Sequence, residues 1–214
     1  MKSVLVAAAI LIIYSCNPSG KNNQKNNSSE NENHLNSGTT KYKSDDYEGA
    51  LLDYNKAIEL EPNNAEAYVH RGLTKYTLGD NRGAIQDYNK AIELKTTTAE
   101  VYILRGNAQR NISSFMDAMD DYNKAIEIKL NFSDAYYNRG LTKIKLQDYK
   151  GALEDLSKAI ELDNKITLAY YDRGFAKYFM GDRNGACLDW SKAGELGYFS
   201  VYDTIKKYCN TVKE

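Results

Sequence analysis

The chain has 214 residues, 42% of them hydrophobic and 27% charged, which is enough apolar material for one or two globular domains. Its 28 lysines and arginines are balanced by 29 aspartates and glutamates, giving a formal net charge of −1. This balance argues against nucleic acid as a partner, because nucleic-acid binding requires a basic surface. The chain has two histidines and no common metalloprotease, serine-hydrolase, thiol-redox or phosphate-loop motif. We therefore expect no enzyme, cofactor, metal site or small-molecule substrate.

The first fifteen residues have the pattern of an export signal. Met1 and Lys2 are followed by an apolar run of eleven residues from Val4 to Tyr14. The run is too short to cross a bilayer, which requires about 20 apolar residues. A charged start before a short apolar run is typical of a secretory signal peptide. We expect residues 1–15 to be removed and the mature chain to be exported.

The sequence Ile-Tyr-Ser-Cys at residues 13–16 is similar to the lipobox of bacterial lipoproteins, although Tyr14 is bulkier than usual. The resemblance implies that Cys16 is lipidated and that N-terminal acyl chains hold the protein on the bacterial cell membrane. The alternatives are an ordinary cleaved signal with an incidental cysteine, or a short buried helix. Asn17 is not the aspartate that enterobacterial sorting reads as inner-membrane retention, which favours the outer membrane in a Gram-negative host.

Residues 16–36 are expected to form the lipidated N-terminus and a flexible linker. The segment is rich in Asn, Ser and Lys, and Leu35 is its only large aliphatic residue. So little apolar surface cannot offset the entropy of ordering the chain, so the composition predicts a stalk.

The rest of the chain repeats with a period of 34 residues. Three of the repeating columns are Ala50, Ala84, Ala118, Ala152 and Ala186; Asp53, Asp87, Asp121, Asp155 and Asp189; and Arg71, Arg105, Arg139 and Arg173. Within one period, Ala65–Leu78 and Asn81–Leu94 each carry apolar residues at helical spacing. The unit is therefore predicted to be a helical hairpin, in which the small residues Gly72 and Ala84 let the two helices approach closely.

This unit resembles the tetratricopeptide repeat, a 34-residue motif with the pattern W-x2-L-G-x2-Y, then A-x3-F, then P. The matching positions are Tyr68, Gly72, Ala84, Tyr88 and Ala91. The departures are Arg71 in place of Leu, Lys75 in place of Tyr, and a closing proline only at Pro62. The resemblance covers about four fifths of the chain and implies an all-α fold, a right-handed α-solenoid of helix-turn-helix repeats.

Five copies of the repeat fit the sequence. They are a degenerate first repeat at 31–64, followed by 65–98, 99–132, 133–166 and 167–200. Residues 201–214 suit a polar-faced capping helix, which a solenoid requires at its end.

The charged and aromatic columns are expected to be structural. An active site needs one asymmetric set of groups, whereas the Arg and Asp residues recur in every repeat and are expected to pair across helices. Partly exposed pairs of this kind contribute about 0 to 1 kcal/mol each. The repeated tyrosines are expected to lie in the core: Tyr54, Tyr68, Tyr88, Tyr102, Tyr122, Tyr136 and Tyr170. Trp190, which replaces Tyr88 in the last repeat, is expected to lie there too.

In the tetratricopeptide family, the first helices of the repeats line a concave face that holds extended peptides or partner helices. The resemblance implies a groove formed by Val69, Leu73, Tyr76, Ile103, Asn107, Tyr137, Leu141, Ile144, Tyr171, Phe175 and Tyr178. Tyrosine suits such a groove because its rigid ring contributes contact area at low entropic cost. The equally weighted alternative is that these side chains pack against the neighbouring repeat. The Lys and Asn residues with which some family members grip a terminal carboxylate are essentially absent from these columns.

Two cysteines remain if Cys16 is acylated. In an exported protein, pairing of Cys187 with Cys209 would staple the capping helix to the last repeat. The alternative is that both are small buried hydrophobic side chains.

Taken together, these features predict a non-catalytic protein–protein interaction scaffold, lipid-anchored in the bacterial cell envelope, that captures a peptide or helix in its concave groove. The alternative is a permanent structural subunit of an envelope assembly, with no exchangeable ligand. A domain that is monomeric and stable alone would favour the scaffold, whereas one that needs its partner to stay soluble would favour the subunit.

Overall fold

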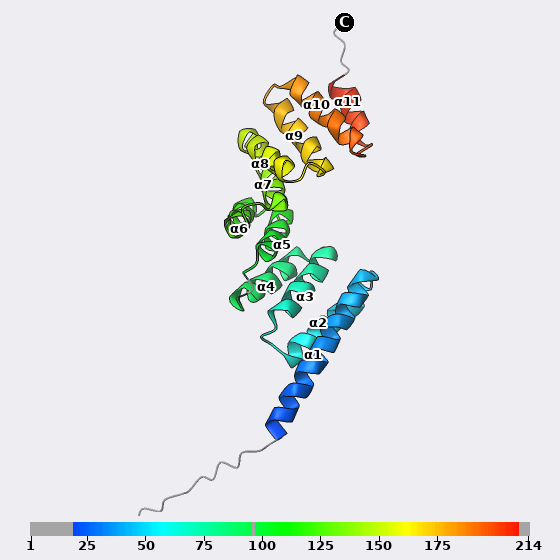
Figure 1. The fold of residues 1–214 in the computed structure, drawn as a ribbon, viewed down its shortest axis with the longest axis vertical. Coiled ribbons are helices and arrows are strands. Elements are labelled where there is room, and N and C mark those ends of the chain that lie inside the picture. The colour runs from blue at the N-terminus through cyan, green and yellow to red at the C-terminus, as the bar shows by residue number, and fades with distance from the viewer. Residues whose placement is uncertain (1–18, 96, 210–214) are drawn as a thin grey trace, which may run out of the picture.

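The structure is a computed structural model that describes residues 19–95 and 97–209. These residues form eleven α-helices and contain no strand, as the repeat pattern predicts. The helices stack into an elongated array that runs from α1 at one end to α11 at the other (Figure 1). The predicted signal peptide and the lipidation site Cys16 lie outside the described residues. None of the helices in the described part combines the length and apolarity needed to span a bilayer.

Ten of the helices pair into five hairpins, and each hairpin packs against the next along the chain. The pairs are α1 (Ser19–Lys43) with α2 (Tyr47–Leu60), α3 (Ala65–Thr77) with α4 (Asn81–Glu93), α5 (Ala99–Asn111) with α6 (Phe115–Ile128), α7 (Ser133–Lys145) with α8 (Tyr149–Leu162), and α9 (Thr167–Phe179) with α10 (Arg183–Glu195). The last helix, α11 (Val201–Tyr208), packs against α10. The chain is thus an all-α solenoid with a terminal helix.

The second helix of most hairpins begins at an aspartate cap. In the second hairpin, the Asp80 carboxylate accepts a hydrogen bond from the Gly83 N–H at 2.8 Å, which satisfies one of the free donors at the start of α4. Gly79 precedes this cap with a φ of 85°, a backbone conformation that glycine adopts without steric cost. The turn between the two helices is therefore encoded locally in each repeat.

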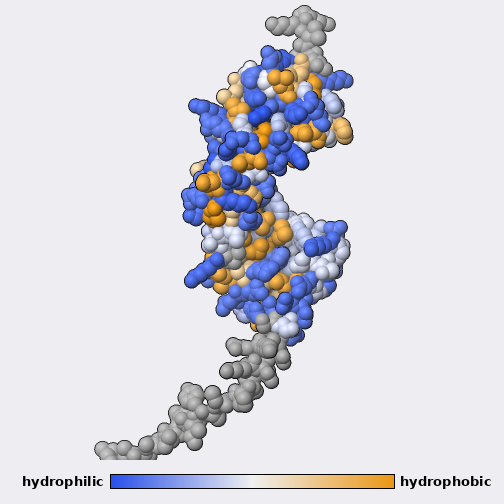
Figure 2. Space-filling model, in the orientation of Figure 1, coloured by the Kyte–Doolittle hydropathy of each residue, from blue (hydrophilic) through white to orange (hydrophobic). Residues whose placement is uncertain are grey.

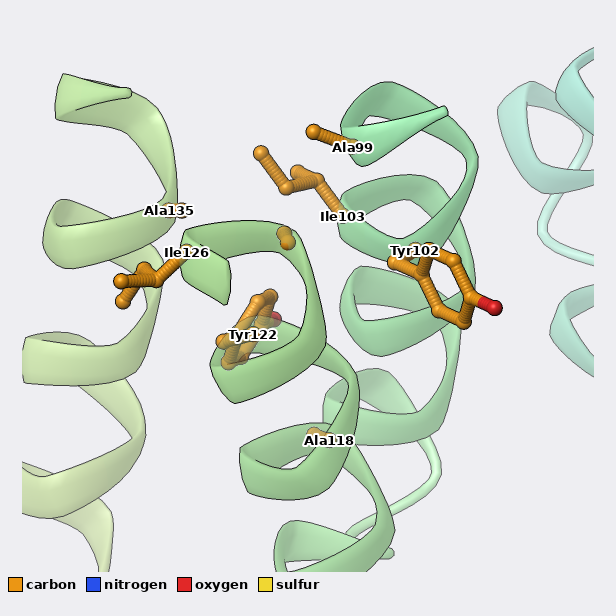
Figure 3. Packing of buried hydrophobic residues seen from close by; sticks show 8 residues of the cluster. Ala99, Tyr102, Ile103, Ala118, Tyr122, Ile126 and Ala135 are labelled. Carbon is orange, nitrogen blue, oxygen red and sulfur yellow. The ribbon is translucent and has the colours of Figure 1, made fainter. Parts of the chain in front are cut away.

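The centre of each hairpin is a large side chain packed against a small one. A Cβ atom placed on Gly72 would lie 2.8 Å from a ring carbon of Tyr88, so the predicted close approach of the two helices is confirmed. Figure 3 shows the same layer in the third hairpin, where Tyr122 and Ala118 of α6 pack with residues of α5 and α7. Trp190 is fully buried at this position in the fifth hairpin, as predicted.

Three of the tyrosines predicted to be core residues are only half-buried. Tyr68, Tyr136 and Tyr170 lie beneath arginine side chains, and the Arg71 guanidinium carbon is 5.3 Å from the centre of the Tyr68 ring. Tyr102 lies beneath Arg105 in the same way, at 5.6 Å, but is buried, so the stacking is common to the column whereas the exposure is not.

Two buried tyrosine hydroxyls differ in their partners. Tyr122 donates a hydrogen bond to the Asn107 side-chain oxygen at 2.8 Å, whereas the Tyr88 hydroxyl has no hydrogen-bond partner among the described residues. Leu73 holds the position in the second repeat that Asn107 holds in the third. Burial raises the pKa of the Tyr122 hydroxyl to about 12, and it raises that of Tyr88 well above the usual range.

We expect Tyr122→Phe to lower the free energy of unfolding by about 1 kcal/mol, because Asn107 would lose its partner. Tyr88→Phe is expected to leave stability unchanged or to raise it by up to about 1 kcal/mol, since it removes an unsatisfied buried hydroxyl. Urea unfolding followed by circular dichroism measures the free energy of unfolding of both variants. Equal losses in the two would contradict the assignment of partners.

The structure differs from the predicted flexible linker at 16–36, because the chain is helical from Ser19 onward. The Asn31 side chain is buried, donates to the Ala57 carbonyl at 2.6 Å and accepts from the Asn64 amide at 2.8 Å. Leu35 packs nearby against the first core cluster, which includes Tyr54. This part of the helix is held by specific amide hydrogen bonds to α2 and the start of α3, which composition alone does not reveal.

The Arg and Asp columns form a ladder along the solenoid. In the second hairpin, Arg71 donates to both carboxylate oxygens of Asp87, at 2.9 and 2.6 Å, and its remaining nitrogen donates to Asn55 of the preceding hairpin at 2.8 Å. The equivalent pairs are Arg105 with Asp121, Arg139 with Asp155, and Arg173 with Asp189. These aspartates are only 3–5% exposed, so the expectation that the pairs are partly exposed was wrong for the carboxylates. Removing one partner of such a pair is costly, because it leaves the other charge buried without its counter-charge.

The third hairpin lacks one member of this ladder. In the second, fourth and fifth repeats, a lysine nitrogen also lies 2.8 Å from the buried aspartate. In the third repeat, Gln109 takes the place of this lysine, and its side-chain oxygen is buried without a partner among the described residues. We expect Gln109→Lys to raise the free energy of unfolding by about 0.5–1 kcal/mol, through a second cation on Asp121. The matched reverse change, Lys143→Gln beside Asp155, should lower it similarly in the same urea titration. A destabilising Gln109→Lys would contradict this account.

Candidate functional site

The first helices of the hairpins form one continuous side of the solenoid. Each of α3, α5, α7 and α9 contacts the next in this series. In Figure 1, α5 and α7 lie on the indented side of the array, whereas α6 and α8 lie on the opposite side. The space-filling view shows the same indentation at mid-length (Figure 2). All of the predicted groove residues belong to these four helices.

Part of the predicted groove packs inside the solenoid. Ile103 is 7% exposed and belongs to the core cluster of the third hairpin, although it also lines a second cavity of about 200 Å³. Val69 and Tyr76 are partly buried against the core shared by the second and third hairpins. Leu73 is partly exposed, and Asn107 is engaged by the Tyr122 hydroxyl. These positions serve packing first, which was the alternative open at the level of sequence.

The aromatic residues of α9 are engaged by the C-terminal segment. The rings of Tyr171 and Tyr198 lie 4.8 Å apart between centroids, those of Phe175 and Tyr208 6.3 Å, and those of Tyr178 and Tyr208 4.9 Å. The sulfur atoms of Cys187 in α10 and Cys209 after α11 form a disulfide, with an S–S distance of 2.04 Å. The capping helix therefore covers part of the surface that the sequence assigned to a groove.

The remaining predicted residues meet at a pocket on the indented side. Leu141 and Ile144 of α7 line a cavity of about 460 Å³, and Tyr137 lies beside it. The other lining residues are Arg110, Asn111, Ser113, Phe115, Lys145 and Asp172. The pocket thus combines an apolar wall with two cations and one carboxylate, contributed by α5, α6, α7 and α9.

The carboxylate in this pocket has an unusual environment. Burial raises the pKa of Asp172 to about 6, while a hydrogen bond from Tyr137 and the charges of Arg110 and Lys145 act in the opposite direction. The Tyr137 hydroxyl donates to Asp172 at 3.0 Å, and burial together with this carboxylate raises the pKa of the hydroxyl. The burial of Asp172 therefore outweighs the two cations near it.

Sequence reasoning missed Arg110, Lys145 and Asp172. Arg110 and Asp172 each carry a charge found in no other repeat: Arg110 aligns with Tyr42, Tyr76, Ile144 and Tyr178, and Asp172 with Asn36, His70, Leu104 and Asn138. Lys145 shares its charge only with Lys43 of the degenerate first repeat and aligns otherwise with Thr77, Asn111 and Phe179. A charge that appears in one repeat only has no role in the repeated scaffold. That asymmetry was the available signal. Within the described residues, no group of three or more His, Cys, Asp or Glu side chains could hold a metal ion.

The five hairpins, the Arg–Asp ladder that joins them and the pocket on the indented side are the features of a helical-repeat solenoid. Models of the tetratricopeptide repeat match residues 65–98 and 133–165, and a TPR repeat model matches residues 38–79. A crystal structure of MamA is 30% identical, covers 80% of this chain and 97% of its own, and has a TM-score of 0.68. The chain belongs to the tetratricopeptide repeat proteins. Proteins with these repeats are generally non-catalytic scaffolds for protein–protein interaction, and this chain has their architecture.

Two further solved structures share the fold at lower identity. YrrB, described as a TPR protein with an unusual peptide-binding site, is 20% identical, with 81% of this chain and 90% of YrrB covered and a TM-score of 0.68. PilF of Pseudomonas aeruginosa is 18% identical, with 86% of this chain and 90% of PilF covered and a TM-score of 0.73. No curated protein matches the chain significantly.

Proposed function

We propose that this protein is a lipid-anchored scaffold of the bacterial cell envelope that captures a peptide or helix of another protein on the indented face of its repeats. The observation that carries this proposal is the pocket between α5, α7 and α9, where apolar side chains occur together with Arg110, Lys145 and Asp172. Sites that bind protein segments commonly join an apolar anchor to a few polar groups. The unusual peptide-binding site of YrrB is a precedent for such binding by a solenoid of this fold.

The proposal of a lipid anchor is based on the sequence alone. The lipobox-like residues 13–16 end at Cys16, ahead of the start of α1 at Ser19. An acylated Cys16 would place the repeats close to the membrane surface and raise the effective concentration of a captured partner for other envelope proteins. In a protein anchored in this way, the binding face would recruit other proteins to the membrane.

Lipidation at Cys16 has a direct test. Cells that express the full chain should incorporate a labelled fatty acid into it and retain it in the membrane fraction. Cys16→Ser should abolish the labelling and change the fractionation. Equal labelling of both proteins would refute this anchor without touching the proposed binding face.

The binding face is tested by comparative affinity capture from native envelope extract with the tagged full chain. The test variant is Leu141→Ala with Ile144→Ala, and the matched control is Leu52→Ala with Met116→Ala, two side chains that are 70% and 68% exposed on second helices. We expect the first variant to lose a partner that the unmodified chain and the control retain. A partner held equally by all three would contradict capture on the indented face and favour a permanent structural subunit.

A further inference from the structure

The pocket on the indented face has two cations that form no direct ion pair among the described residues. The side chains of Arg110 and Lys145 form no hydrogen bond or ion pair within 19–95 and 97–209. By contrast, Arg105, on the same helix as Arg110, pairs with Asp121, and Lys143 next to Lys145 pairs with Asp155. Arg110 and Lys145 act on Asp172 only through longer-range charge and have no counter-ion in direct contact within the described part of the chain, so their donors can meet the charge of a ligand.

The walls between these cations are apolar. Leu141 and Ile144 on α7 and Phe115 at the start of α6 line the same cavity. An apolar wall removes water from one side of a charged group, so a counter-ion placed there interacts more strongly than it would on an open surface. Asp172 of α9 is the one carboxylate among the lining residues, and it accepts a hydrogen bond from the Tyr137 hydroxyl of α7.

We propose that this pocket accepts an acidic side chain from an apolar stretch of the bound peptide, with Arg110 and Lys145 as its counter-charges. This inference rests on the proposed function, because it names the kind of segment that the indented face takes. The methylene groups of a glutamate would contact Leu141 and Ile144, while its carboxylate lies between the cations. The first helices α3, α5, α7 and α9 follow one another along this face, and the pocket lies among α5, α7 and α9.

Asp172 opposes such a ligand and makes its binding depend on pH. The groups that face Asp172 are Tyr137 and Lys145 on α7 and Arg110 on α5. Burial holds the pKa of Asp172 at about 6, so its negative charge is lost as the pH falls through that value. The net charge of the pocket then rises by one unit, and affinity for a carboxylate should increase. The increase should end near pH 4.3, about the pKa of glutamate, where the ligand itself becomes neutral.

The test uses two blocked tripeptides as probes and the full chain in a mild detergent. Acetyl-Leu-Glu-Leu-amide carries the carboxylate, and acetyl-Leu-Gln-Leu-amide is its uncharged match. Isoleucine methyl NMR reads the pocket through Ile144, with the core residue Ile126 as the internal control. We expect a saturable shift of the Ile144 signal with the glutamate probe only, and no shift of Ile126 with either probe.

Two variants sharpen the result. Arg110→Gln with Lys145→Gln should weaken the glutamate probe by at least about tenfold, because both charge-assisted contacts are lost. Asp172→Asn should strengthen it roughly fivefold at neutral pH and remove the increase in affinity toward acidic pH. An unchanged Ile126 signal confirms that each variant is folded.

Equal responses to the two probes, an absence of saturable shifts, or indifference to the Arg110 and Lys145 changes would overturn the proposal. A third probe, acetyl-Leu-Leu with a free terminal carboxylate, separates the source of the charge, and tighter binding of this probe than of the glutamate probe would also overturn it. If the glutamate probe fails while the Leu141 and Ile144 variant still loses its partner, the proposed function stands without this ligand class. If both experiments fail, the indented face is not the binding face.

Discussion

Asp121→Ala is expected to lower the free energy of unfolding by about 3 kcal/mol, near the lower end for a broken buried ion pair. Asp121 is 4% exposed and accepts hydrogen bonds from two nitrogens of Arg105, with 2.7 Å between Nε and Oδ2. Removing the carboxylate leaves a mostly buried guanidinium without its counter-charge. We expect a loss near the lower end of the range for buried ion pairs because the Arg105 side chain is still 20% exposed to water.

The matched control for this prediction lies on the same helix. Glu127 pairs with Lys124 at 2.8 Å, but both side chains are more than half exposed, so Glu127→Ala should cost less than about 0.5 kcal/mol. Urea unfolding of both variants, followed by circular dichroism, gives the comparison. A small and equal effect of the two substitutions would show that the buried ladder contributes no more than a surface pair.

The second large effect is expected at the disulfide. Replacing Cys187 and Cys209 with serine should lower the free energy of unfolding by about 3 kcal/mol, because the bond closes a loop across a sequence separation of 22 residues. Without it, α11 is held to α10 by apolar contacts such as Val201 and by the ring contacts of Tyr208. The terminal helix should therefore separate at a lower denaturant concentration than the central repeats.

Trp190 reports this step, because it is the one tryptophan of the chain and its ring lies 5.6 Å from that of Tyr208. Its fluorescence should change at a lower urea concentration in the double serine variant, and the same shift should appear when the unmodified chain is treated with a thiol reductant. Reductant should have no effect on the double variant. Quantitative thiol labelling of Cys187 and Cys209 in the unfolded, unreduced chain would contradict the bond itself.

The repeat period made the hairpins predictable. Helices expected at Ala65–Leu78 and Asn81–Leu94 are found at Ala65–Thr77 and Asn81–Glu93. The agreement follows from local causes, since helical spacing, the Asp80 cap and the turn at Gly79 all lie within one repeat. The packing of Gly72 against Tyr88 was likewise visible in the pattern of small and large residues.

Features that join distant parts of the chain were not predictable in the same way. The Asn31 side chain holds α1 by donating a hydrogen bond to the Ala57 carbonyl and accepting one from the Asn64 amide, which composition cannot reveal. The loss of Tyr171, Phe175 and Tyr178 from the groove depends on where α11 packs. The pocket depends on charges that do not recur through the repeats, so a search for repeated columns passes over them.

The most direct test of capture on the indented face is photo-crosslinking in living cells. Benzoylphenylalanine would be placed at Leu141, in the pocket, and separately at Met116, which is exposed on the opposite helix layer. We expect irradiation to join a partner protein to the chain labelled at position 141 and not to the chain labelled at position 116. Crosslinking from position 116 alone would place the interaction on the second helices and contradict the proposed binding face.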